Sequence, residues 1–243
     1  MEQIKVGIFT DTHANLPALE NILKEFKLRG MDEIIHLGDV LSMGAYPKEC
    51  MEILLKNPQI QSVRGNHDDD YLKNITLRRG FSHVPPEHKE YEFRAAGDDY
   101  RPIMEKLPYV INKQWYERKF TFMHYARFFD EKIGRERFYV IEENPTPQKL
   151  DEMFKKADGE VVFFGHKHSP MVMEGERLYI DVGSLGCHKY SYARAIILTV
   201  KSDRTYTIER IKVPYDRQKL LDEMDKKQIP GREEMKNFYF AGE

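Results

Sequence analysis

The sequence predicts an α/β fold with two sheets and with polar clusters at the ends of buried strands. Residues 4–9 and 33–37 are apolar runs separated by a stretch of helical periodicity, which indicates a strand–helix–strand unit with parallel strands. Short groups of Asp, Asn and His follow such runs, at the edge where ligand groups gather in parallel sheets. The second half of the chain carries many short strand patterns, which indicates a second sheet.

The opening elements are marked by their end signals. Asn15 can cap the first helix, Pro17 lies in its first turn and Gly30 closes it, with apolar residues at helical spacing between them. Pro47 suits the start of a second helix, which carries its own apolar stripe. Residues 60–63 form a short apolar run, which we expect to be a third parallel strand.

Residues 69–107 interrupt this pattern. The segment is charged, contains Pro85-Pro86 and has broken helical periodicity, so we expect helices at 69–79 and 97–106 joined by a mobile loop. The segment is a candidate helical insert that acts as a lid or selects the substrate. A solvated surface excursion without function is the alternative.

The remaining chain alternates strand patterns with two helices. Strands are expected at 109–111, 114–118, 119–123, 161–164, 171–173, 177–181, 193–201 and 205–213, and helices at 146–157 and 216–227. The tail after Pro230 is expected to be loosely held. Because no repeat, linker or low-complexity segment divides the chain, we expect residues 1–243 to form a single domain.

Composition limits the classes of function. Hydrophobic residues make up 41% of the 243 residues, and charged residues make up 32% with a net charge of -2, which argues against long nucleic acid as a partner. Two cysteines are too few for a disulfide scaffold and suit free thiols in a reducing cytosol. No signal peptide and no membrane-spanning run is visible, so a cytoplasmic protein without a membrane partner is expected.

Five polar clusters carry the candidate chemistry, and each follows a segment with the pattern of a strand. They are Asp11-Thr12-His13, Gly38-Asp39, Gly65-Asn66-His67-Asp68, His124 and Gly165-His166-Lys167-His168. Each cluster alone could be an ordinary turn or a core histidine. Together they supply enough imidazole, carboxylate and amide ligands for two metal ions at one sheet edge.

Two such ions can clamp an in-line displacement at phosphorus and lower the pKa of a water so that hydroxide attacks. A pair of ions needs a carboxylate able to bridge them, and Asp39 is the candidate. His67, backed by Asp68, can assist the leaving group as a general acid or as a stabilising charge.

The order of these clusters resembles the calcineurin-like metallophosphoesterase superfamily, from Asp11 to about Ala195. The sequence around Gly38-Asp39-Val40-Leu41 resembles the bacterial small phosphodiesterase and diadenosine-tetraphosphatase-like branch, and it lacks the Asp-Arg-Gly of the protein phosphatases. The turn Asp181-Val182-Gly183-Ser184-Leu185-Gly186 resembles the branch's Asn-Pro-Gly-Ser-Val-Gly. The resemblance implies a four-layer α/β/β/α sandwich of two mixed sheets flanked by helices, with a dinuclear metal site at the carboxyl edge of the strands.

The resemblance also implies a role for each polar residue. Asp11, His13 and His168 would hold one metal ion, and Asn66, His124 and His166 the other. Asp39 would bridge both ions. His67 would face the leaving group, with Asp68 orienting it.

The chain departs from the family pattern in two places. Tyr125-Ala126-Arg127-Phe128-Phe129 stands where Gly-Ser usually follows the metal-ligating histidine, and such aromatics would reshape the substrate mouth. Cys187-His188 replaces Gln-Pro, and this pair either binds metal, becomes oxidised or is simply a tolerated part of the loop. Arg127, Arg135 and Arg137 are either surface charges or donors to a distal phosphate.

The leading hypothesis is a metal-dependent phosphodiesterase or dinucleoside-polyphosphate hydrolase acting on a small phosphorylated substrate, possibly a nucleotide. A phosphomonoesterase, a protein Ser/Thr phosphatase or a non-catalytic binding scaffold with the same fold is the alternative. Two divalent ions are expected, Mn or Fe first, although the ligand set also accepts Zn, Ni or Co.

Overall fold

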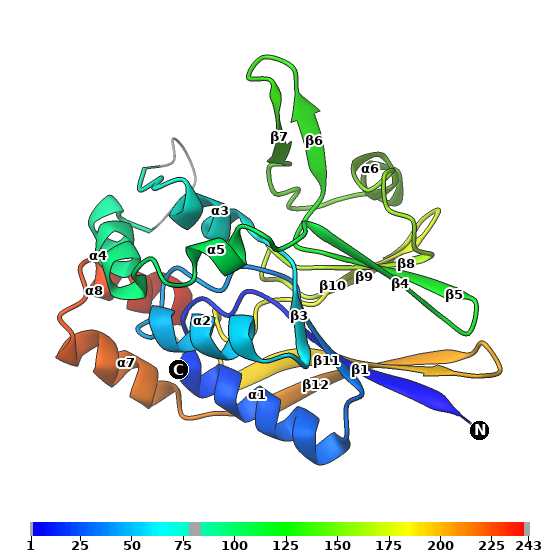
Figure 1. Cartoon of the computed structure of the whole chain (residues 1–243), viewed down its shortest axis with the longest axis horizontal. Coiled ribbons are helices and arrows are strands. Elements are labelled where there is room, and N and C mark those ends of the chain that lie inside the picture. The colour runs from blue at the N-terminus through cyan, green and yellow to red at the C-terminus, as the bar shows by residue number, and fades with distance from the viewer. Residues whose placement is uncertain (1, 78–83, 241–243) are drawn as a thin grey trace.

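The computed structural model describes residues 2–77 and 84–240, in which two five-stranded mixed sheets lie between helices (Figure 1). The first sheet has the order β12-β11-β1-β2-β3, and the second has the order β4-β5-β8-β10-β9. The first sheet consists of β1 (Gln3–Phe9), β2 (Glu33–His36), β3 (Ile60–Ser62), β11 (Tyr192–Lys201) and β12 (Tyr206–Pro214). The second consists of β4 (Val110–Trp115), β5 (Arg118–Met123), β8 (Val161–Phe164), β9 (Met171–Glu174) and β10 (Leu178–Asp181).

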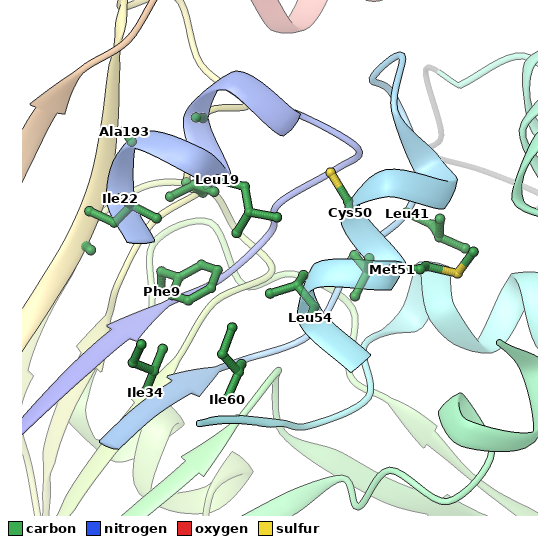
Figure 2. Packing of buried hydrophobic residues seen from close by; sticks show 14 of the residues in the cluster. Phe9, Leu19, Ile22, Ile34, Leu41, Cys50, Met51, Leu54, Ile60 and Ala193 are labelled. Atoms are coloured by element: carbon green, nitrogen blue, oxygen red, sulfur yellow. The ribbon is translucent and has the colours of Figure 1, made fainter. Parts of the chain in front are cut away.

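Three layers of apolar side chains hold these elements together. Helices α1 (Leu16–Arg29) and α2 (Pro47–Lys56) cover the outer face of the first sheet, where Phe9 packs between them (Figure 2). A second cluster fills the space between the sheets, and a third packs α6 (Pro147–Met153) on the second sheet. The predicted four-layer α/β/β/α sandwich is therefore confirmed. No helix in the described residues is long and apolar enough to span a membrane.

The parallel strands end together, which brings the polar clusters to one edge. β1 pairs in parallel with β2, and Phe9 lies opposite His36 at their ends. β2 pairs in parallel with β3. In the second sheet β5, β8 and β10 are parallel, so that Phe122 lies beside Phe163. The carboxyl ends of these six strands therefore deliver the loops that follow them to a common region.

The 69–107 segment is more ordered than the sequence indicated. Helix α3 (Asn66–Leu72) begins three residues before the predicted 69–79 helix and ends seven residues before its predicted end. Residues 78 and 79 of that prediction lie outside the described residues. Much of the predicted mobile loop is α4 (Pro86–Ala96), and the 97–106 helix shortens to α5 (Arg101–Met104). The buried Lys89 ammonium on α4 lies 2.7 Å from a buried Asp70 carboxylate, which anchors α4 against α3.

Two hairpins differ from the prediction. The prediction of separate strands at 109–111 and 114–118 is wrong, because β4 continues unbroken through residues 112 and 113. The chain turns into β5 at Tyr116 and Glu117, whose φ angles of 48° and 68° suit a tight two-residue hairpin. Strands β6 (Arg127–Asp130) and β7 (Arg135–Phe138) form a separate hairpin that projects from the molecule (Figure 1). This hairpin was not predicted, because its many charged residues hide the alternation of apolar and polar side chains.

The prediction of a loosely held tail is wrong. Helix α7 (Arg217–Lys226) leads into α8 (Arg232–Met235) and a π-helical turn, η1 (Lys236–Phe240). The buried Met235 and Phe240 join α7 in an apolar cluster that includes Met43 and Cys187. This cluster ties the tail to the loops beside the polar edge.

Replacing Phe240 with alanine is therefore expected to destabilise the protein by about 3–5 kcal/mol, the usual cost of emptying a buried aromatic site. Phe238, two residues away, is 57% exposed and provides the matched control, because Phe238→Ala should change stability by only about 0.5 kcal/mol. Urea unfolding of the two variants measures the difference. Equal midpoints would show that the tail contributes nothing to the core.

Candidate metal centre

The seven residues expected to ligate metal all lie directly after a strand of one or the other sheet. In the first sheet, Asp11 and His13 follow β1, Asp39 follows β2 and Asn66 follows β3. In the second sheet, His124 follows β5, and His166 and His168 follow β8. Six of these side chains, all except Asn66, fall into two groups of potential ligands, within each of which the ligand atoms lie within 4.8 Å of one another.

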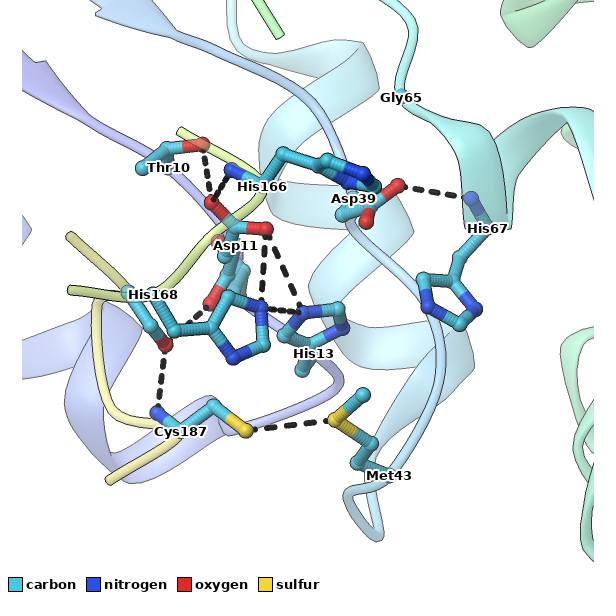
Figure 3. A network of polar contacts seen from close by, with 12 residues as sticks. Thr10, Asp11, His13, Asp39, Met43, Gly65, His67, His166, His168 and Cys187 are labelled. Atoms are coloured by element: carbon cyan, nitrogen blue, oxygen red, sulfur yellow. Dashed lines mark hydrogen bonds and ion pairs between the residues drawn. The ribbon is translucent and has the colours of Figure 1, made fainter. Parts of the chain in front are cut away.

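The first cluster is Asp11, His13 and His168 (Figure 3). The Nε2 atoms of the two histidines are 2.9 Å apart, and Asp11 Oδ1 lies 3.5 Å from the first and 3.2 Å from the second. Asp11 Oδ2 accepts hydrogen bonds from the Thr10 hydroxyl at 2.7 Å and the His166 N–H at 3.0 Å. One oxygen of Asp11 is thus held by the fold, and the other faces the imidazoles.

The second cluster is Asp39, His124 and His166, with Asn66 beside it. His124 Nε2 lies 3.2 Å from Asp39 Oδ2, 3.2 Å from His166 Nδ1 and 3.0 Å from Asn66 Oδ1. Asp39 Oδ1 accepts the backbone N–H of His67 at 2.8 Å. Asp39 therefore repeats the arrangement of Asp11, with one oxygen anchored and one facing the cluster.

The residues present fit divalent cations. His13 Nδ1 lies 2.7 Å from Leu41 O, and His124 Nδ1 lies 2.9 Å from Leu37 O. A ring nitrogen that donates to a carbonyl leaves the lone pair on Nε2, which is how proteins orient metal-binding histidines. In that tautomer the lone pair of His124 faces Asp39 Oδ2 and Asn66 Oδ1, so that three acceptors point toward one position. A cation satisfies all three.

The electrostatics of the two clusters favour positive charge. Burial opposes protonation, but the Asp39 and Asp11 carboxylates raise the pKa of His124 to about 9. Burial also opposes ionisation of Asp39, yet the nearby His124 and His67 hold its pKa well below the usual value. Burial and His124 lower the pKa of His166 to about 3, so this imidazole is a neutral donor of a lone pair.

The ligands are held by unusual backbone. Five of the seven adopt left-handed φ angles, namely Asp11 (52°), His13 (48°), Asp39 (57°), His166 (74°) and His168 (64°). Such conformations cost residues other than glycine free energy and are maintained only by the surrounding structure. Adjacent glycines allow close approach, since a Cβ on Gly65 would lie 2.2 Å from Asp39 Oδ1 and one on Gly165 would lie 2.4 Å from Asp11 Oδ2.

His67 and Asp68 lie on the first turn of α3, beside the clusters. The His67 ring is 5.4 Å from the His13 ring and nearly perpendicular to it (Figure 3). The orienting role of Asp68 toward His67 stays a prediction, and its carboxylate also accepts hydrogen bonds from the backbone N–H groups of Asp39, Val40 and Gly65 at 2.9 to 3.0 Å. Asp68 therefore also fixes the loop that carries Asp39.

Three residues that the sequence analysis did not single out support the clusters. His36 Nε2 lies 3.1 Å from the Thr12 hydroxyl, and the Ser184 hydroxyl donates to Asp11 O at 3.2 Å. Glu92, buried on α4, accepts the backbone N–H of Ser42, next to the Leu41 carbonyl that orients His13. Of the three, only Ser184 lies in a motif that the sequence marks, the glycine-rich turn after β10. The position of Glu92 depends on how α4 packs against the loop that carries Ser42.

The departures from the family pattern have distinct environments. Tyr125 is buried, with its ring 4.8 Å from the His166 ring, so it packs behind a proposed ligand. Arg127 and Arg137 form ion pairs within the β6–β7 hairpin, with Glu136 at 2.9 Å and Asp130 at 3.0 Å. The buried Cys187 Sγ contacts Met43 Sδ at 3.3 Å, and burial raises the pKa of the thiol to about 12.

The chain belongs to the calcineurin-like phosphoesterase superfamily, whose domain model matches residues 4–203. Membership in this superfamily makes it a phosphoesterase. Among curated proteins, an uncharacterized protein from Methanocaldococcus jannaschii is 26% identical over 246 residues and covers 95% of this chain and 96% of its own length.

Solved structures share the fold along the whole chain. A metallophosphoesterase from Sphaerobacter thermophilus has a TM-score of 0.70 at 21% identity and covers 96% of this chain and 98% of its own. A hypothetical protein from Pyrococcus horikoshii has a TM-score of 0.77 at 18% identity and covers 99% of both chains. At these identities the likeness concerns the fold.

Proposed function

We propose that the protein hydrolyses phosphodiesters or the anhydride bonds of dinucleoside polyphosphates with the help of two divalent metal ions. The observation that carries this proposal is the pair of buried histidine–carboxylate clusters. The two clusters are adjacent, because the backbone N–H of His166 in the second cluster donates to the carboxylate of Asp11 in the first. Adjacent ion sites suit chemistry at phosphorus.

Each proposed ligand has a stated part. Asp11, His13 and His168 would hold one ion, and Asn66, His124 and His166 the other, with Asp39 between them. Bound divalent ions supply Lewis acidity and lower the pKa of an attacking water. We expect Mn²⁺ or Fe in the cell, although the mixed imidazole and carboxylate donors also accept Zn²⁺, Ni²⁺ or Co²⁺.

The protein's own acid in this scheme is His67. Its ring lies beside the first cluster, and its Nδ1 is shielded from solvent, so Nε2 is the atom that would give a proton to the departing oxygen. The hydrogen bond from the His67 backbone to Asp39 fixes the acid relative to the bridging carboxylate. In this proposal the proton would be transferred beside the first cluster, next to the His13 ring.

In our proposal residues 1–243 form a single domain that carries this function. The 69–107 segment would be the insert that selects the substrate. Support comes from α4, which is anchored by the Lys89–Asp70 ion pair and reaches the Ser42 backbone through Glu92. The packing of the C-terminal turn with Met43 extends the same unit to Phe240. A cytoplasmic location and a small phosphorylated substrate complete the proposal.

Hydrolysis of bis-p-nitrophenyl phosphate, p-nitrophenyl phosphate and diadenosine tetraphosphate tests the proposal. We expect no turnover after chelation, restoration by Mn²⁺ and preference for the diester or the tetraphosphate. Preference for the monoester would instead establish a phosphomonoesterase. Failure of every divalent ion to restore turnover, in protein that still binds metal, would overturn the proposal in favour of a binding scaffold.

A further inference from the structure

Aromatic side chains form a partly exposed stack on the loop that follows β10. Tyr190 and Tyr192 are parallel within 7°, with ring centroids 5.3 Å apart, and Tyr190 is 45% exposed. The His188 ring lies 5.1 Å from the Tyr192 ring. We call these three residues the tyrosine platform. A parallel pair of rings with an exposed member presents a flat surface on which another aromatic ring can stack.

Positive side chains surround the platform. Lys189 Nζ lies 5.4 Å from the centroid of Tyr190, and Lys212 Nζ lies 5.0 Å from that of Tyr192. The Arg194 guanidinium is 5.6 Å from the Tyr192 ring. Within residues 2–77 and 84–240, none of these three cations forms an ion pair with a carboxylate. Their charge is therefore available to an anion.

His188 adds a ring nitrogen that can donate a hydrogen bond. Its Nδ1 accepts the backbone N–H of Tyr190 at 3.2 Å, so the neutral ring carries its proton on Nε2. That Nε2 is shielded from solvent and makes no hydrogen bond of ordinary geometry within the described part of the chain, although the Leu185 backbone acts to raise the pKa of the ring. Burial and the Arg194 charge lower the pKa of His188 to about 3, which keeps the ring neutral. A shielded donor among cations is a position that a phosphate oxygen would satisfy.

The platform is fixed in place and joined to the metal centre. Arg194 Nη1 donates to His168 O at 3.3 Å, which connects the platform to a proposed ligand whose side chain is itself 20% exposed. Arg217 donates to the carbonyls of Lys189 and, at 2.9 Å, Phe240. These contacts hold the backbone of the loop in place, so that only the side chains covering His188 Nε2 would have to move when an anion binds.

We propose that the tyrosine platform binds a nucleotide portion of the substrate, with the base stacked on Tyr190 and a non-reacting phosphate held by Lys189, Arg194 and His188 Nε2. This inference rests on the proposed hydrolysis, whose substrate class it narrows to phosphoesters and phosphoanhydrides that contain a nucleoside. The metal centre would act on the neighbouring phosphorus, and the platform would set which esters remain bound long enough to react.

Two substrates with the same leaving group test the stacking. One is the p-nitrophenyl ester of thymidine 5′-phosphate, and the other is methyl p-nitrophenyl phosphate, which lacks a base. Tyr190→Ala is expected to raise the KM for the thymidine ester by roughly tenfold, as expected for one lost base-stacking contact, and to leave the methyl ester unchanged. Tyr190→Phe keeps the ring and should behave as the parent protein. Equal effects of Tyr190→Ala on both esters would overturn the proposal.

Binding to the chelated protein provides a readout that does not need hydrolysis. With EDTA present, calorimetry should show AMP binding more tightly than adenosine or inorganic phosphate, and His188→Ala should remove the advantage over adenosine. If AMP binds in this way but no ester is hydrolysed with any metal, the platform stands and the proposed function fails. If metal-dependent hydrolysis occurs while AMP binding does not depend on Tyr190 or His188, the platform fails and the proposed function stands.

Discussion

Replacing Asp39 with asparagine is expected to reduce metal-dependent phosphodiester hydrolysis by about a thousandfold, which corresponds to roughly 4 kcal/mol of lost transition-state stabilisation. The substitution removes the charge proposed to bridge two ions and to face His124 Nε2 at 3.2 Å. Asparagine suits the test because it tolerates the φ of 57° at this position and keeps an oxygen for the His67 N–H.

The measurements for Asp39→Asn are kcat/KM with added Mn²⁺, the metal content and the thermal unfolding midpoint. We expect an intact fold and a loss of bound metal. Asp158→Asn provides the control, because that carboxylate is 62% exposed and pairs with Lys119 away from the proposed ligands. Full activity in Asp39→Asn would rule out the bridging assignment.

Replacing His67 with alanine is expected to lower kcat by about 10²–10⁴-fold, the range for loss of a general acid. Metal content should not change, because His67 lies outside both ligand clusters. The loss should depend on the leaving group. An alkoxide needs a proton as it departs, whereas p-nitrophenolate is a stable anion, so alkyl diesters should be affected far more than nitrophenyl esters.

Loss of metal from His67→Ala would instead identify the histidine as a ligand. A uniform loss across leaving groups, with metal retained, would indicate that His67 stabilises charge on the phosphoryl group rather than transferring a proton. Gln provides the matched variant, since it keeps a hydrogen-bond donor but cannot act as an acid at neutral pH.

The strand–helix–strand opening and the positions of the proposed metal-binding motifs could be predicted because their signals are local. Asn15 does cap α1, accepting the Ala18 N–H at 3.2 Å, and Gly30 does end it in a left-handed conformation with a φ of 66°. The parallel pairing of β1, β2 and β3 follows from the helical crossovers between them, α1 and α2. Ligands at consecutive strand ends then gather at one edge.

The parts that escaped prediction depend on contacts between distant segments. Helix α4 is rich in charge, and the burial of Lys89 becomes favourable only because Asp70 meets it from α3. The tail looked polar, yet Phe240 joins Met43, almost two hundred residues earlier in the chain. The position of Asp68 next to His67 in the sequence suggested a role in orienting that ring. Its hydrogen bonds to the Asp39 and Val40 backbone could not be predicted from neighbouring residues in the sequence.

The left-handed backbone at Asp11, His13, Asp39, His166 and His168 has a consequence for the history of such folds. At each of these positions glycine would relieve strain, by about 1 kcal/mol or more per residue. A lineage that stopped needing the chemistry would gain stability by accepting glycine there, whereas a lineage under selection for hydrolysis could not. Glycine at these five positions would therefore be the mark of a descendant that has abandoned catalysis, whereas the five side chains present here are the ones that the proposed metal sites require.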